Sequence, residues 1–138
     1  MNKMMKYPIR TLGVVLALLL GACNTDPFSE QPDKLATTAK TFEGTVRWGN
    51  LQQIYAFLKK DPANTVEIAE GLDNVRVTSY ELLSPLSKES DHRWRQTVLI
   101  DYVLIDRQVV RQVVDEQVWV SDDDGVSWYR EQPLPAFN

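Results

Sequence analysis

Acid–base chemistry in this 138-residue chain would need a carboxylate, a tyrosine and a cationic side chain on one face of a sheet. Pairing the two long apolar segments about Asp106-Arg107 puts Tyr102, Arg111 and Asp115 on the same face. Tyr55 is expected to approach that face from a preceding helix. Burial would then shift the pKa values of these groups. The alternative, which we favour, is a structural Arg111–Asp115 ion pair at a partly solvated edge.

The same side chains suit a binding cavity as well as a catalytic one. A cavity between helices and sheet, lined by aromatic and apolar side chains with a few polar groups, is typical of small-ligand sites. Val98 would contribute to the apolar lining. The candidate ligand-binding residues are Phe42, Tyr55, Tyr102, Arg111 and Asp115.

Residues 121–128, Ser-Asp-Asp-Asp-Gly-Val-Ser-Trp, fit the pattern S-x-D-x-G-x-[ST]-W. This pattern predicts a tight hairpin in which Asp123 accepts backbone amides, Gly125 adopts a positive φ and Trp128 packs beneath the turn. It resembles the Asp box of sialidases, where such boxes are structural turns. A calcium loop is excluded by spacing, since that motif needs an acid where Val120 stands.

Other chemistry-bearing residues show no catalytic or metal-binding spacing. His92, the only histidine, lies in a charged stretch and is expected to be a solvated loop residue. We find no Ser-His-Asp arrangement, phosphate loop or metal-ligand pattern, and expect no catalytic residue, metal or cofactor. The four tryptophans are expected to pack in the core and on the sheet, the alternative being a carbohydrate-binding platform. Trp94 and Trp119 are expected to form a cross-strand pair.

The single cysteine, Cys23, follows an export-type segment. Residues 1–10 contain three basic residues and no acid, and residues 12–20 are uncharged and apolar. A basic start, a short apolar core and small residues at the end are typical of a secretory signal. The apolar run falls short of the roughly 20 residues that a membrane-spanning helix needs.

The sequence Leu20-Gly21-Ala22-Cys23 resembles the lipobox of bacterial lipoproteins. The resemblance implies removal of residues 1–22, a diacylglycerol on the Cys23 sulfur and further acylation such as palmitate. Asn24 after the cysteine implies sorting to the outer membrane, with the domain on its periplasmic face. The alternative is an ordinary export signal with a chance cysteine.

Charge and cysteine content restrict the partners of the remaining chain. Three of the 15 basic residues lie within residues 1–22, so residues 23–138 carry 12 basic and 19 acidic residues, a net charge of −7. An acidic domain disfavours nucleic acid and anionic membrane surfaces. With Cys23 acylated, no thiol remains for a disulfide, a metal site or catalysis.

The elements that must position these residues form one domain, over residues 35–138. Residues 23–34, polar and broken by prolines, read as a lipidated tether. Two helical stripes follow, with a bend at Gly49-Asn50, and a third short helix is predicted over residues 65–70. Strands are predicted near residues 75–83, 93–105, 108–120 and 127–132, with loops over residues 84–91 and 122–125. Helices followed by an antiparallel meander of about four strands predict an α+β domain.

This order of a bent helix pair followed by a curved antiparallel sheet resembles the nuclear transport factor 2-like, or cystatin-like, fold. The resemblance covers residues 35–137 and implies no particular activity, because the fold hosts enzymes, binding modules and dimerisation domains. Both faces of the long central strands are apolar. We therefore expect the helices to pack on one face. The other face should be covered by a partner, a second copy or a ligand; it carries Leu99, Val103, Val110 and Val114.

The sequence thus predicts an envelope lipoprotein with three alternative roles. The first is a non-enzymatic interaction or assembly module with a homodimer or envelope protein partner, held to the membrane by lipid on Cys23. The second is a small-ligand carrier. The third is an acid–base enzyme using Tyr102 and Asp115.

Overall fold

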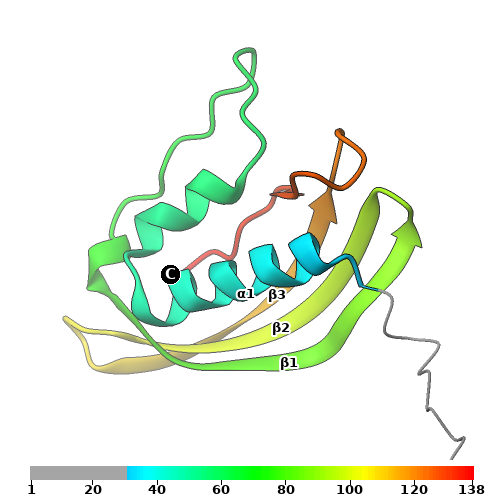
Figure 1. Cartoon of the computed structure of the whole chain (residues 1–138). Helices are drawn as coiled ribbons and strands as arrows, with labels where there is room; N and C mark the ends of the chain where they lie inside the picture. Colours follow the sequence, from blue (N-terminus) through cyan, green and yellow to red (C-terminus); the bar gives the residue numbers. More distant parts are fainter. Residues whose placement is uncertain (1–30) are drawn as a thin grey trace, which may run out of the picture.

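The computed structural model describes residues 31–138, so the predicted signal peptide, Cys23 and most of the tether lie outside the described residues. One α-helix precedes a four-stranded antiparallel sheet with strand order β1-β2-β3-β4. Figure 1 shows the sheet curving around the helix. The α+β class predicted from the sequence is therefore confirmed.

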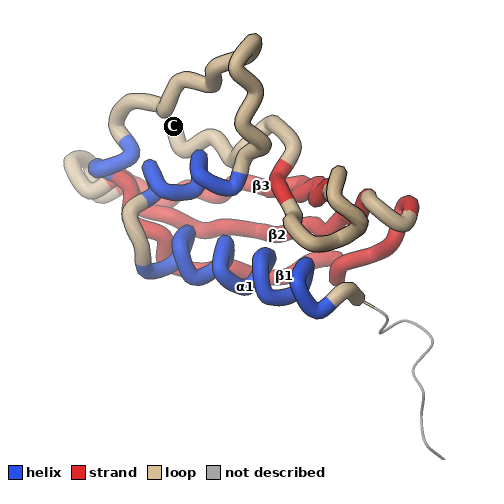
Figure 2. Tube along the Cα trace, turned by 45° about the horizontal axis from the view of Figure 1, so that its top comes forward, coloured by secondary structure: helices blue, strands red, loops and turns tan. Residues whose placement is uncertain are grey.

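Helix α1 spans Asp33–Trp48 and lies along the concave face of the sheet (Figures 1 and 2). Its buried residues are those of the predicted stripe, Leu35, Ala39, Phe42 and Val46. Spacings of four, three and four place these side chains on one face of a helix, which explains why that face packs on the sheet. Within residues 31–138 no helix is long and apolar enough to cross a membrane.

The second helical segment, η1, is a 3-10 helix over Leu51–Phe57. The Asn50 side chain caps it by accepting a hydrogen bond from the backbone N–H of Gln52 at 2.9 Å. A further 3-10 turn, η2, spans Leu72–Asn74. The helix predicted over residues 65–70 is wrong, because these residues run without helical hydrogen bonds in a segment that projects from the body (Figure 1).

Strands β2 (Arg93–Leu104) and β3 (Val109–Val120) pair without a register shift around the predicted turn. Leu104 opposes Val109, and Trp94 opposes Trp119, so the predicted cross-strand tryptophan pair is confirmed. The packing expected for Trp48 is wrong, because this residue ends α1 with 79% of its surface exposed. Burial alternates strictly along β2, as expected for a strand with one covered face.

Strand β1 spans Val75–Ser90 and is longer than predicted. The predicted loop over residues 84–91 is wrong, because the strand continues through Pro85 to Ser90. Register shifts follow Val77, Leu82, Ser84 and Lys88. Proline is tolerated in a strand at an edge or a bulge, and β1 is both an edge strand and a bulged one.

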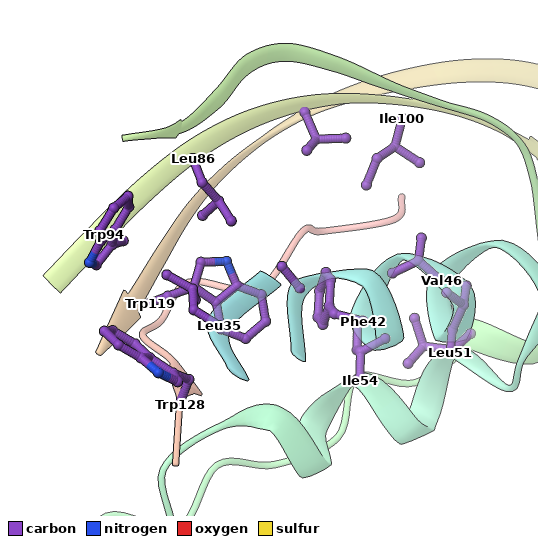
Figure 3. Packing of buried hydrophobic residues seen from close by; sticks show 13 residues of the cluster. Leu35, Phe42, Val46, Leu51, Ile54, Leu86, Trp94, Ile100, Trp119 and Trp128 are labelled. Carbon is purple, nitrogen blue, oxygen red and sulfur yellow. The ribbon is translucent and has the colours of Figure 1, made fainter. Parts of the chain in front are cut away.

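The core fills the space between α1, η1 and the sheet. Figure 3 shows Leu35 and Phe42 of α1 among Leu86, Ile100 and Trp119 of the sheet. The ring of Phe42 meets Trp119 edge to face, with 5.6 Å between centroids. No helix among the described residues covers the opposite, convex face (Figure 2).

Candidate functional site

Tyr102 lies on the helix-covered face, as predicted, but its hydroxyl is occupied by the end of the chain. The hydroxyl donates to the carbonyl oxygen of Asn138 at 3.0 Å and accepts from its backbone N–H at 3.1 Å. Its ring meets Phe137 edge to face, with 5.1 Å between centroids. Tyr102 therefore fixes residues 137–138 over the sheet.

The other candidate residues are engaged by different parts of the chain. The Tyr55 hydroxyl accepts from the backbone N–H of Ala69 at 3.0 Å and so holds the projecting segment. Phe42 and Val98 are fully buried in the core. Arg111 opposes Tyr102 on the neighbouring strand but is exposed. Side chains of the core thus occupy the space between α1 and the sheet at these positions.

Asp115 forms a buried ion pair with Arg130 and not with Arg111. Nη2 of Arg130 lies 2.7 Å from Oδ1 of Asp115, and both side chains are almost fully buried. The ion pair predicted between Arg111 and Asp115 is therefore wrong. Arg130 belongs to β4 (Tyr129–Arg130), whose pairing with Trp119 and Val120 brings its side chain over the concave face.

The environment of this pair is apolar and aromatic. The guanidinium carbon of Arg130 lies 5.2 Å from the ring centroid of Phe42 and 5.8 Å from that of Trp119. Burial raises the pKa of Asp115, while the positive charge of Arg130 opposes this shift. Because a guanidinium stays protonated at neutral pH and touches the carboxylate directly, we take the pair as ionised.

A chain of side-chain hydrogen bonds extends from Asp115 across the sheet. Nε2 of Gln117 donates to Oδ2 of Asp115 at 2.7 Å and to the hydroxyl of Tyr80 at 2.8 Å. Oε1 of Gln117 accepts from Nε2 of Gln96 at 2.6 Å and from the indole of Trp119 at 3.3 Å. Burial raises the pKa of Tyr80, which keeps its phenol protonated.

Asp115 was a predicted site residue, but its partners Arg130, Gln117, Gln96 and Tyr80 were not. A signal for Arg130 was present in the sequence, since it lies two residues after Trp128 and thus on the same face of a strand. Gln96 and Gln117 likewise alternate with Trp94 and Trp119. The alternation of side chains along a strand assigns these polar residues to the buried face, and this was the signal in the sequence for a buried polar network.

The hairpin of residues 121–128 has the predicted Asp-box geometry. Oδ1 of Asp123 accepts from the backbone N–H of Ser127 at 2.7 Å and from the hydroxyl of Ser121 at 2.9 Å. These bonds lower the pKa of Asp123, that from the Ser127 backbone most of all. Gly125 has φ +78°, and Trp128 is buried. The predicted structural turn is confirmed.

His92 is half exposed in the β1–β2 turn, and its Nε2 lies 3.8 Å from Oδ1 of Asp124. Within residues 31–138, no three His, Cys, Asp or Glu side chains are grouped so as to hold a metal ion. Both oxygens of Asp115 accept hydrogen bonds, and its side chain is sealed from water. The Asp115–Arg130 pair is thus suited to fixing β4 and the amide network rather than to acid–base turnover.

No family model, curated protein or solved structure matches this chain.

Proposed function

We propose that this chain is a bacterial lipoprotein, held to the periplasmic face of the outer membrane by lipid on Cys23. Its α+β domain acts there as a non-enzymatic interaction module of the envelope. The lipobox-like Leu20-Gly21-Ala22-Cys23 supports the anchor. One lipid chain holds a protein only marginally, whereas two or more hold it stably, so an acylated Cys23 needs no further membrane-binding surface.

The observation that carries the interaction role is the open edge of β3. Strand β4 pairs with β3 only at Trp119 and Val120, so residues 109–117 of β3 face no partner strand on that side within the described chain. Unpaired backbone N–H and C=O groups along an edge are a template for another strand. This segment also carries Val110 and Val114 with 73% and 54% of their surfaces exposed.

The two edges of the sheet are built differently. The β1 edge is interrupted by four register shifts and by Pro85, devices that prevent a second strand from pairing. The β3 edge pairs with β2 in continuous register and contains no proline, glycine or lysine between Val109 and Gln117. The β3 edge is therefore the one left available for association.

The partner we propose for this edge is a second copy of the chain. A two-fold axis beside Gln112 makes β3 antiparallel to its copy and places Val110 of each chain opposite Val114 of the other. Such pairs of β-branched residues stabilise antiparallel strands. Both copies would use the same edge, as a two-fold interface requires. Both valines lie on the convex face, opposite Val103 and Leu99, so pairing would extend the apolar surface across two copies.

We further infer that the domain is of the nuclear transport factor 2-like type. The inference is supported by the order of the elements, a helix followed by four antiparallel strands curved around it. The 3-10 geometry of η1, where a second α-helix was expected, is a departure from that pattern. The fold type does not specify an activity.

Two experiments test the proposed function separately. Replacement Cys23→Ala should abolish lipid labelling and move the protein out of the membrane fraction. For association, sedimentation of the domain at micromolar concentration should show a dimer that Val110→Lys disrupts. Val126→Lys, at a valine 59% exposed in the β3–β4 turn, is the matched control and should leave the dimer intact. A monomer for the unmodified chain would overturn the self-association.

A further inference from the structure

A small cleft opens between the first turns of α1 and the middle of β1, on the face opposite the apolar convex surface. Its volume is about 200 Å³. Apart from the rim, its lining is made of the apolar side chains of Ala36, Ala39, Leu82 and Leu86 and the polar side chains of Gln31, Tyr80 and Gln96. At its rim, Lys40 and Glu43 pair with each other at 2.8 Å. The cleft is smaller than the pockets of drug-sized ligands.

The direction of the hydrogen bonds beneath this cleft is set by Asp115. An ionised carboxylate only accepts, so the group of Gln117 that faces it must be the NH₂ group. The oxygen of Gln117 is then the acceptor for Gln96, and Gln96 must turn its own NH₂ group inward. The charge of one buried aspartate thus orients two amides in series.

Two hydrogen-bonding groups are left over on Gln96 and Tyr80, which both line the cleft. The carbonyl oxygen of Gln96 accepts from no donor within residues 31–138, although the residue is only 7% exposed. Gln96 is one of the residues that line the cleft. The Tyr80 oxygen already accepts from Gln117, and its hydroxyl proton has no acceptor among the described residues. An acceptor and a donor therefore remain, both linked to the same Gln117 side chain.

We propose that this cleft binds the carboxamide group of a small, partly apolar molecule. A carboxamide carries a carbonyl that accepts from the Tyr80 hydroxyl and an N–H that donates to the Gln96 oxygen. Its apolar part would lie against Ala36, Leu82 and Leu86. The site is separate from the lipid anchor and from the β3 edge, so it does not depend on the proposed function.

Charged ligands fit these two groups less well than a neutral amide. A carboxylate would set an anionic oxygen against the carbonyl oxygen of Gln96, where an amide presents an N–H that can donate to it. An ammonium group would leave the Tyr80 proton without an acceptor. Leaving a buried polar group unpaired is costly, so the site discriminates by which hydrogen bonds a ligand completes.

Benzamide is a suitable probe, because it joins a primary carboxamide to a small apolar ring. In an NMR titration of the purified protein, benzamide should shift the side-chain signals of Gln96 and Tyr80 in a saturable way. N,N-dimethylbenzamide keeps the ring and carbonyl but lacks the N–H, and benzoate replaces the amide by an anion. Both should bind at least about fivefold more weakly, the effect of one hydrogen bond of about 1 kcal/mol.

Two variants test the site from different sides. Tyr80→Phe removes the donor and should weaken benzamide binding about fivefold. Ala36→Leu fills the cleft from α1 without touching the amide network and should abolish binding. Tyr129→Phe removes a tyrosine hydroxyl away from the cleft and serves as the control. The proposal is overturned if benzamide produces no saturable shift, if the dimethyl compound or benzoate binds equally well, or if Tyr80→Phe and Ala36→Leu leave the affinity unchanged.

Discussion

Nη2 of Arg130 lies 2.7 Å from Oδ1 of Asp115 in a part of the core that water does not reach. The contact joins β4 to the middle of β3, fifteen residues earlier in the chain. Oδ2 of the same carboxylate orients the amides of Gln117 and Gln96. One ion pair therefore holds a two-residue strand in place and sets the polarity of the buried network.

Removing one member of this pair should be far more damaging than replacing both. Asp115→Leu leaves a buried guanidinium without its counter-ion and should lower the free energy of unfolding by about 3–5 kcal/mol. The double replacement Asp115→Leu with Arg130→Met removes both charges and should cost much less than the sum of the single changes. Urea unfolding of the unmodified protein, Asp115→Leu, Arg130→Met and the double variant measures this coupling, and additive single effects would show that the pair is not the organising contact.

Replacing Gly125 or Gly44 by alanine should change the stability of the protein in opposite directions. Gly125 has φ +78° in the Asp-box hairpin, a conformation that costs an alanine about 1 kcal/mol or more, so Gly125→Ala should destabilise the domain. Gly44 lies inside α1, and an added Cβ there would meet no atom within 4 Å. Gly44→Ala should therefore stabilise the protein by about 0.5–1 kcal/mol. Thermal unfolding measures both effects: the midpoint temperature should fall for Gly125→Ala and rise for Gly44→Ala.

The Asp-box hairpin should make stability sensitive to acid through Asp123. Hydrogen bonds from Ser127 and Ser121 lower the pKa of its carboxyl in the folded protein. An acid with a lowered folded pKa contributes stability above its unfolded pKa, and this contribution is lost as the pH falls through the folded value, here below about pH 4.

Asp123→Asn keeps an acceptor oxygen but removes this titration, so its free energy of unfolding should fall less steeply with acid than that of the unmodified protein. Asp124→Asn, at an adjacent exposed carboxylate outside the hydrogen bonds of the turn, is the control. Unfolding by urea at a series of pH values separates the three proteins. Identical acid dependence in the unmodified protein and in Asp123→Asn would contradict this role for the Asp123 carboxylate.

Local patterns predicted most of the long elements. Spacing along α1 identified its buried face, and the turn at Asp106-Arg107 followed from two apolar runs that flank a polar pair. The end of β1 was missed because Pro85 and the polar residues after it are typical of a loop. Edge position and bulges, which accommodate such residues, are properties of the whole sheet and not of the local sequence.

The candidate site was predicted only in part, for a similar reason. Tyr102, Arg111 and Asp115 do share one face of the sheet. The pairing of Asp115 with Arg130 depends on how a strand of only two residues returns to β3, and that return is made by the Asp-box hairpin. Sequence periodicity assigns a face to a residue but does not choose among several charged partners.

Hydrogen exchange along β3 tests the proposed self-association most directly, because it reads the backbone groups of the edge itself. The outward amides of residues 109–117 should exchange freely in a dilute sample and become protected as the concentration rises through the micromolar range. Residues 79–87 of the bulged β1 edge should exchange equally at both concentrations. Exchange of residues 109–117 that stays the same over this range would contradict pairing of two copies through β3.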